Sequence, residues 1–192
     1  MVDVVELQRR GARRFTELVE RVGDGWDAPT PATEWTVRDL VNHVTAEQLW
    51  APPLMDGATI AEVGDRFDGD VLGDDPVGQW RQAIAAANEA FAAPGAMDRT
   101  VHLSFGDTSA EEYTWQMVSD LHLHGWDLAT ALGEDDTIDP DAAEALLSVM
   151  SQQEEMLRQS GMFGEHLPVP DDADDQVRLL ALVGRRPGGA GS

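Results

Sequence analysis

The stretch Ser109–Gly133, SAEEYTWQMVSDLHLHGWDLATALG, decides the fold because it predicts one long amphipathic helix. Ser109 followed three residues later by Glu112 has the spacing of a capping box, and Gly133 stands where a glycine commonly ends a helix. Between them, apolar or small residues recur at intervals of three and four, so one stripe of the helix is expected to face a core. The residues of this stripe are Val118, Leu121, Gly125, Leu128 and Leu132.

Three polar residues of this predicted helix lie close together on one side of it. Asp120 and His124 are four residues apart and Asp127 is three residues further on, so at 100° per residue all three fall within about 60° of arc. A carboxylate and an imidazole one turn apart can bind the same metal ion. They can equally form a plain hydrogen-bonded pair, so helical spacing alone leaves both interpretations open.

The composition is that of a single acidic domain. The chain has 192 residues, with 13 Lys and Arg against 36 Asp and Glu, and its formal net charge is −23. Such a charge argues against binding to nucleic acids or to anionic membranes. Cysteine is absent, which excludes disulfides, thiolate metal ligands and a cysteine nucleophile. No apolar run approaches membrane-spanning length and the N-terminal MVDVVELQRR lacks the apolar core of a signal peptide, so we expect a cytoplasmic protein.

Hydrophobic periodicity predicts further helices before and after the central one. Thr36 is an N-cap candidate with Asp39 three residues on, while Asp75 and Asp139 each precede a proline that can occupy the first helical position. With almost no strand, the pattern predicts an all-α chain built as a four-helix bundle with a short C-terminal helix. The predicted helices besides the central one cover residues 2–22, Thr36–Trp50, 76–93, 140 to about 159, and about 174–183.

Two stretches lack the helical period. Ala51–Asp75 is expected to be irregular and acidic, with a short helix near Ile60–Val63. Its run GDRFDGDVLGDD lacks the ligand spacing of an EF-hand, so we interpret it as a solvated loop, with calcium binding as a weaker alternative. Thr100–Phe105 alternates apolar and polar residues and is expected to be an extended connector, because one strand alone cannot make a sheet. Residues 1–187 are expected to form one domain and residues 188–192 a disordered tail.

A candidate third metal ligand lies on the helix predicted after Thr36. His43 sits at the edge of that helix's apolar stripe, and Glu47 follows one turn later. A lone histidine there is usually an ordinary core residue, but Asp120 and His124 on the central helix offer it partners. Side chains of facing helices converge inside bundles, and two nitrogens with one oxygen form a three-ligand set that leaves positions open for water or substrate. Without thiolates, zinc, nickel, iron and manganese are all compatible metals.

The other histidines are poorer candidates. His122 is two residues from His124, so the two rings point about 160° apart on a helix and only one can serve a given site. The residues one turn either side of His122 are not metal ligands, which selects His124. His102 could approach only from the extended connector, and His166 falls in a loop without a helical partner. Ser104 has no general base nearby, no phosphate-binding glycine pattern is present, and the six tryptophans are expected to belong to the core.

Four stretches resemble a known family: PTPATEWTVRDLVNHV, GDRFDGDVLGDDP, HLHGWDLATALG and VPDDADDQVRLLALVGRRP. Together they resemble the actinobacterial DinB-like metal-binding superfamily and, within it, the N-terminal domain of the mycothiol-dependent maleylpyruvate isomerases. The likeness runs from about residue 10 to residue 187. It implies a DinB-like four-helix bundle with one divalent metal, usually zinc, and it carries the ligand roles onto His43, Asp120 and His124. The resemblance implies that the isomerases have glutamate where this chain has Asp120. Aspartate is one methylene shorter, so its carboxylate reaches less far from the helix.

The resemblance also implies a chemistry. In this family the nucleophile is expected to be the thiol of mycothiol and the acceptor a small electrophile, with a metal ion that lowers the pKa of the thiol. The isomerases carry a second, C-terminal domain that helps to form the substrate site, whereas this chain is expected to stop after the bundle. Isomerase activity therefore does not transfer with the fold alone.

The sequence leads to one main hypothesis and two alternatives. We expect a mycothiol-dependent thiol transferase or isomerase-like enzyme, in which Glu47 or Asp127 acts as an acid/base or supports the metal ligands. The alternatives are a non-catalytic module that binds a metal or a small molecule, and a bundle whose polar trio is only a buried network. The expected partners are a small-molecule thiol and an electrophilic substrate, without nucleic acid or membrane, and a homodimer is one possible assembly.

Overall fold

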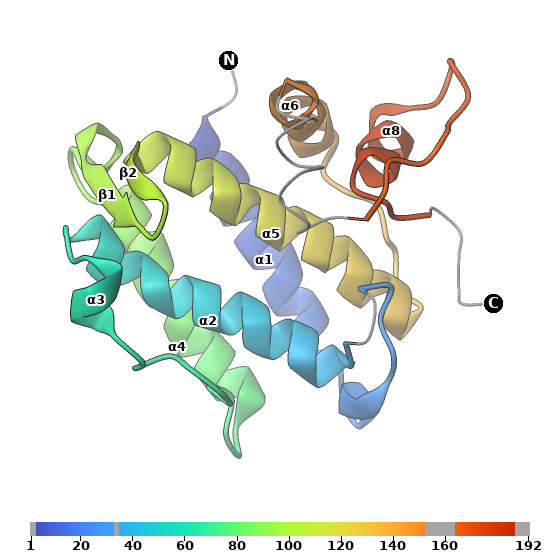
Figure 1. Ribbon diagram of the computed structural model, residues 1–192. Coiled ribbons are helices and arrows are strands. Elements are labelled where there is room, and N and C mark those ends of the chain that lie inside the picture. The colour runs from blue at the N-terminus through green and yellow to red at the C-terminus, as the bar shows by residue number, and fades with distance from the viewer. Residues whose placement is uncertain (1–2, 33–34, 153–163, 187–192) are drawn as a thin grey trace.

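The computed structural model describes residues 3–32, 35–152 and 164–186 of the chain, and helices dominate it. The bounds are α1 Val4–Val19, α2 Val37–Met55, α3 Ile60–Val63, α4 Pro76–Ala92, α5 Ala110–Leu132, α6 Pro140–Ser151 and α8 Asp175–Leu182, with single 3-10 turns at Gly25–Asp27 and Ala96–Asp98. The bundle consists of α1, α2, α4 and α5, with α2 and α5 in front of α1 and α4 (Figure 1). The predicted all-α bundle with a short C-terminal helix is confirmed.

The central helix α5 begins and ends at the residues that the sequence indicates. Glu112 N donates to Ser109 Oγ at 3.1 Å and Ser109 N donates to a Glu112 carboxylate oxygen at 3.3 Å, which completes the capping box. At the other end Gly133 adopts φ 67°, the left-handed conformation that glycine adopts without strain. Helix α2 begins with a second capping box between Thr36 and Asp39.

The bundle core lies where all four helices meet. The Phe15 and Trp80 rings are 4.7 Å apart, and Trp80 Nε1 donates to Thr16 Oγ1 at 2.9 Å, so α1 and α4 are joined by both apolar and polar contacts. Helix α1 approaches α5 closely at Gly11, where a Cβ atom would lie only 2.9 Å from His122 Nε2. Fully burying one large apolar side chain stabilises a fold by roughly 1.5–3 kcal/mol. Large side chains buried here include Phe15, Leu18, Leu40, Leu72, Trp80 and Leu121.

Helix α2 is longer than the sequence predicts. We expected it to end at Trp50, but it continues to Met55 through Pro52 and Pro53. Prolines inside a helix remove backbone hydrogen bonds and clash with the preceding turn. Ala51, Leu54 and Met55 are nonetheless buried in an apolar cluster with α4 and α5, and we attribute the extra turn to that burial.

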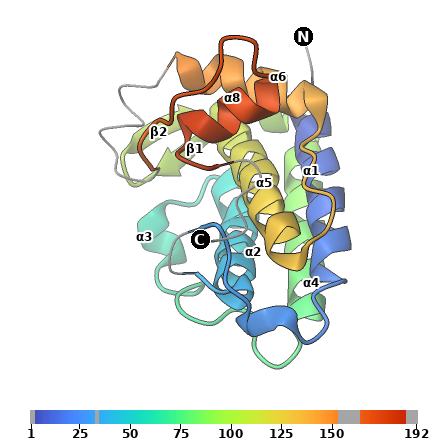
Figure 2. The same cartoon turned by 90° about the vertical axis from the view of Figure 1, so that its right-hand side faces the viewer.

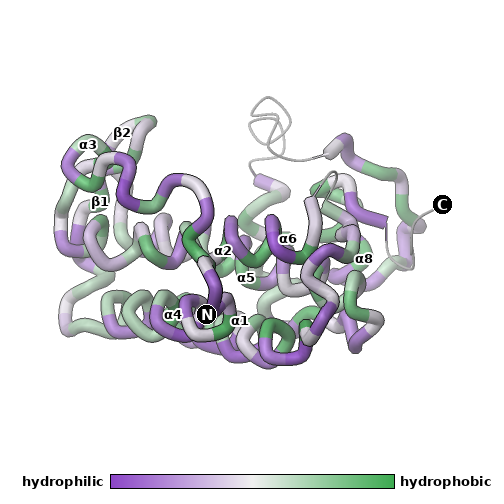
Figure 3. Tube along the Cα trace, turned by 90° about the horizontal axis from the view of Figure 1, so that it is seen from below, coloured by the Kyte–Doolittle hydropathy of each residue, from purple (hydrophilic) through white to green (hydrophobic). Residues whose placement is uncertain are grey.

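The extended connector is also different from the prediction, because it is half of a hairpin. Strand β1, Thr100–Leu103, pairs antiparallel with β2, Gly106–Ser109, so that Val101 lies opposite Thr108. Strand β2 is not predicted by its residues GDTS, because they show no apolar alternation. The hairpin and α3 lie together at one end of the bundle (Figure 3).

The C-terminal helices cover one side of α5 (Figure 2). Leu146 of α6 and Leu179 and Leu180 of α8 are buried in one apolar cluster with Leu123 and Trp126 of α5. The end predicted for α6 near residue 159 and the tail over 188–192 lie outside the described residues. Among the described residues, no helix has both the length and the apolar character needed to cross a membrane.

Candidate metal centre

The structure brings His43, Asp120 and His124 together. His43 comes from α2 and the other two from α5, and one ligand atom of each lies within 4.8 Å of the others. The two helices run antiparallel, and the buried residues that flank His43 on α2 turn its ring towards α5. The rings of His43 and His124 meet edge to face, with centroids 5.3 Å apart. Facing helices thus converge on a point that one ion could share.

The electrostatics of this trio suit a cation. Burial, and then the neighbouring His124, lower the pKa of His43 to about 4, so its imidazole is neutral at pH 7 and has a lone pair to donate. Burial raises the pKa of Asp120, against the opposing effects of His124 and Arg185. The Asp120 carboxylate has no hydrogen-bond partner in the part of the chain that the structure describes. A partly buried carboxylate that accepts no hydrogen bond loses part of its solvation, and a bound divalent ion would offset that loss.

Trp35 covers the two histidines. Its ring centroid lies 4.9 Å from that of His43 and 5.7 Å from that of His124, with tilted planes in both cases. We expected the tryptophans to be core residues, but Trp35 is only partly buried and lines the cavity beside His43. Its place in the sequence, one residue before the N-cap of α2, puts it outside any helical pattern. The aromatic surface shields one side of the cluster from water.

Asp127 fixes the orientation of His124. His124 Nδ1 lies 3.0 Å from Asp127 Oδ2, and Arg185 donates to the same carboxylate from Nε at 2.8 Å and from Nη2 at 2.6 Å. Burial alone would raise the pKa of Asp127, but the hydrogen bonds from Arg185 and His124 outweigh it and hold that pKa below its ordinary value. An ionised carboxylate only accepts, so Nδ1 of His124 donates to it and Nε2 is the ring nitrogen that remains to bind a cation.

Glu47 is the carboxyl group that can hold a proton near neutral pH. It lies one turn after His43 and is mostly buried, and burial followed by repulsion from Asp120 raises the pKa of Glu47 to about 7. The Tyr113 hydroxyl is buried on the same side of α5 without a hydrogen-bond partner among the described residues. Burial, Glu47 and Asp120 all raise the pKa of Tyr113, which keeps its hydroxyl protonated.

A cavity of about 630 Å³ adjoins His43 and opens towards solvent. One wall is α2 and the other is part of the acidic run that we interpreted as a solvated loop. That run is tied to α2, because Asn42 Nδ2 donates to Gly69 O at 2.9 Å and Arg38 donates to Asp70 at 2.8 Å. No lysine or arginine lines the cavity among the described residues. The lining residues are Trp35, Asp39, Asn42, His43, Ala46, Phe67, Asp68 and Gly69.

Comparison with known proteins identifies the family. Residues 8–129 match the model of the mycothiol maleylpyruvate isomerase N-terminal domain. The chain belongs to this family. Two uncharacterized proteins of Mycobacterium tuberculosis, Rv0738 of strain H37Rv and MT0763 of strain CDC 1551, are each 32% identical to it over 191 residues, covering 96% of this chain and 98% of the relative.

Two solved structures share the fold of this family member. The crystal structures of the mycothiol-dependent maleylpyruvate isomerase and of a histidine-to-alanine mutant of it match with TM-scores of 0.63 and 0.64. Each match covers 88% of this chain and 75% of the other, at 18% and 17% identity. At such low identity, these two matches establish the shared fold alone. The family resemblance seen in the sequence is confirmed by the domain match.

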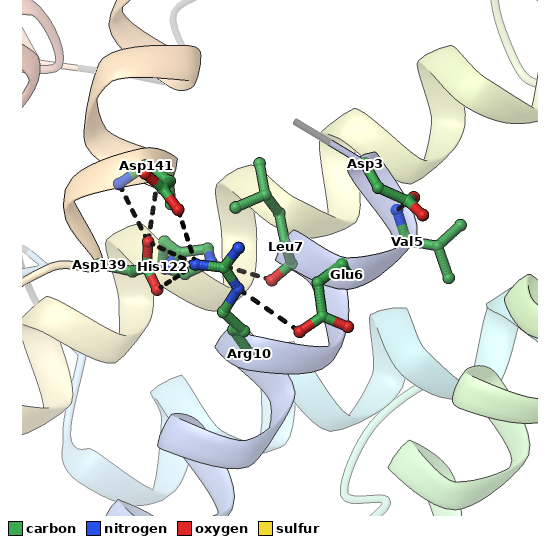
Figure 4. Close-up of polar contacts among 9 residues, drawn as sticks. Asp3, Val5, Glu6, Leu7, Arg10, His122, Asp139 and Asp141 are labelled. Atoms are coloured by element: carbon green, nitrogen blue, oxygen red, sulfur yellow. Dashed lines mark hydrogen bonds and ion pairs between the residues drawn. The ribbon is translucent and has the colours of Figure 1, made fainter. Parts of the chain in front are cut away.

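The remaining histidines lie away from the centre in this family member. His122 is buried on the opposite side of α5 and donates from Nε2 to Leu7 O at 3.2 Å, next to Arg10 and Asp139 (Figure 4). His102, on β1, lies 2.7 Å from the Asp107 carboxylate, and His166 is exposed in the segment before α8. The structure therefore separates His122 from the trio, as the helical spacing predicts.

Proposed function

We propose that this protein is a divalent-metal-dependent enzyme that uses the thiol of mycothiol as a nucleophile towards a small electrophile. Membership of a mycothiol isomerase domain family supports mycothiol as the thiol. The observation that carries the proposal is the convergence of His43, Asp120 and His124 beside an open cavity. A metal ion held by only three protein ligands keeps a coordination position free for a ligand from solution.

The three side chains have the chemistry that a divalent ion such as zinc requires. His43 is neutral at pH 7, His124 presents Nε2, and Asp120 offers a carboxylate to which no described residue donates a hydrogen bond. Nickel, iron and manganese accept the same nitrogen and oxygen ligands. When bound, zinc would lower the pKa of a coordinated thiol and make the thiolate available at neutral pH. Because the chain has no cysteine, that thiol must come from a cofactor.

Glu47 is the residue that we propose to move the proton. When a thiolate forms a sulfur–carbon bond, the electron pair displaced on the acceptor becomes a negative charge, which a proton from Glu47 neutralises. In the reverse elimination Glu47 takes that proton back as the bond breaks. A group with a pKa of about 7 exchanges protons efficiently at physiological pH. Asp127, which is ion-paired and buried, suits the orientation of His124 better than acid/base catalysis.

The cavity beside His43 indicates the class of acceptor. Asp39 and Asp68 contribute carboxylates to its lining, and no lysine or arginine is among the described residues that line it. Asp39 is engaged with Thr36 in the capping box, whereas Asp68 is exposed at the mouth. We therefore expect neutral or cationic electrophiles to react in preference to dicarboxylates, which the acidic lining repels.

Turnover with mycothiol tests the proposal. Zinc-loaded and metal-free protein are incubated with mycothiol and a panel of neutral, cationic and dicarboxylate electrophiles, and conjugates are followed by mass spectrometry. We expect a metal-dependent rate that His43→Ala abolishes and that His122→Ala, the matched control, preserves. Bound metal without a metal-dependent rate for any electrophile would contradict the enzyme and leave a metal-binding module.

A further inference from the structure

The C-terminal segment reaches the metal centre from a distant part of the sequence. Helix α8 is anchored by Leu179 and Leu180, which are fully buried in the apolar cluster on α5. The chain turns back after this helix, and Arg185 N donates to Leu180 O at 2.8 Å. This turn points the Arg185 side chain at Asp127, 58 residues earlier in the chain.

Gly184 makes the turn and fixes its position. Its φ of 76° is in the left-handed region, which favours glycine. A Cβ atom on Gly184 would lie 2.6 Å from the Gly164 Cα atom, so the two backbones cross too closely for any side chain. Leu167 N also donates to Ala181 O at 2.9 Å. The residue after Gly184 is therefore held in one place by backbone contacts on both sides.

The Arg185–Asp127 contact is a two-point clamp. The guanidinium donates from Nε to Oδ1 at 2.8 Å and from Nη2 to Oδ2 at 2.6 Å. The Asp127 side chain is fully buried and the Arg185 side chain is 12% exposed, so solvent cannot replace this pairing readily. A planar guanidinium bound to both carboxylate oxygens fixes the plane of the carboxylate as well as its position. Asp127 Oδ2 then lies 3.0 Å from His124 Nδ1.

We propose that Arg185 is a positioning residue of the metal centre, acting on His124 through Asp127. The clamp sets the plane of the Asp127 carboxylate, and that carboxylate sets the ring orientation and the tautomer of His124, so that Nε2 faces His43 and Asp120. The C-terminal segment is thereby part of the site as well as a cover for α5. This inference rests on the proposed metal binding by the trio, but the effect on the His124 ring can be measured without a metal.

Two measurements test Arg185 separately from catalysis. Zinc affinity is measured by competition with a chromophoric chelator, and the His124 tautomer is read from the ring ¹⁵N shifts of the metal-free protein. We expect Arg185→Gln to weaken zinc binding by about 10–100-fold, the usual effect of losing a group that supports a metal ligand. We also expect it to convert His124 from the single Nδ1–H tautomer to a mixture. Arg178→Gln, at an exposed arginine of α8, is the matched control and should change neither.

Two further variants protect the test against a simple loss of folding. Arg185→Lys keeps the charge but cannot donate to both Asp127 carboxylate oxygens in one plane. We expect its zinc affinity to lie between those of the parent and Arg185→Gln, with an unchanged urea midpoint. In the double variant with Asp127→Asn, Arg185→Gln should cause little additional loss, because its effect passes through Asp127. Near-parent zinc affinity and a single His124 tautomer in folded Arg185→Gln or Arg185→Lys would overturn the inference. A parent protein that binds no zinc would instead contradict the proposed function, while the ring ¹⁵N shifts would still decide the role of Arg185.

Discussion

Glu47→Gln is expected to change the pH dependence of stability in the metal-free protein. Burial and then Asp120 raise the pKa of Glu47 from its ordinary 4.5 to about 7. Between these values the folded state keeps a proton that the unfolded state has released, so the free energy of unfolding falls as the pH rises. The loss is about 1.4 kcal/mol per pH unit, or roughly 3 kcal/mol over the whole window. Glutamine does not titrate and avoids this loss.

The assay for Glu47→Gln is urea unfolding in the presence of a chelator, from pH 5 to pH 8.5. Relative to the parent protein, we expect the free energy of unfolding of the variant to rise by about 2–3 kcal/mol between pH 5 and pH 8.5. The rise should be complete once the pH exceeds the folded-state pKa of Glu47. Glu89→Gln, at an exposed position of α4, is the matched control and should run parallel to the parent. If the difference between Glu47→Gln and the parent does not vary with pH, the burial argument for Glu47 is wrong.

Three further predictions follow from the site and the packing. Asp120→Asn should weaken zinc binding at least about 10-fold in a metal titration, because it removes the only charge among the three ligands, while circular dichroism remains unchanged; unchanged affinity would exclude Asp120 as a ligand. Gly11→Ala should lower the free energy of unfolding in urea by about 1 kcal/mol, because its Cβ would lie 2.9 Å from His122 and 3.0 Å from Leu121. This strain exceeds the gain in helix propensity, and an equally stable variant would contradict that packing. In gel-shift assays at physiological salt the protein should not retard nucleic acid, given its net charge of −23, and tight binding would refute this.

The features that the sequence predicts well depend on spacing along one helix. The capping boxes at Thr36 and Ser109 use residues three apart, and the preference for His124 over His122 follows from the direction of each ring on α5. His43 could be assigned to the same site because a bundle packs the apolar stripes of its helices against each other. Residues at the edges of two facing stripes, such as His43 and His124, therefore come close together. These signals are local or depend only on the period of a helix.

The features that the sequence does not predict depend on contacts between distant segments. Arg185 reaches Asp127 only because Gly184 turns the chain after α8, and no spacing rule connects residues 58 positions apart. Trp35 precedes its helix, so no periodicity assigns its ring to the two histidines. The turn of α2 beyond Pro52 exists despite the local preference of proline, because the residues around it are buried.

The metal content of the purified protein tests the proposed centre most directly. Native mass spectrometry and elemental analysis of protein expressed with several divalent metals available should find close to one ion per chain. The variant His122→Ala, whose ring points at α1, should retain the ion, whereas His43→Ala and His124→Ala should lose it. Equal metal loss in His122→Ala, or metal retained in both ligand variants, would contradict the assignment of His43, Asp120 and His124.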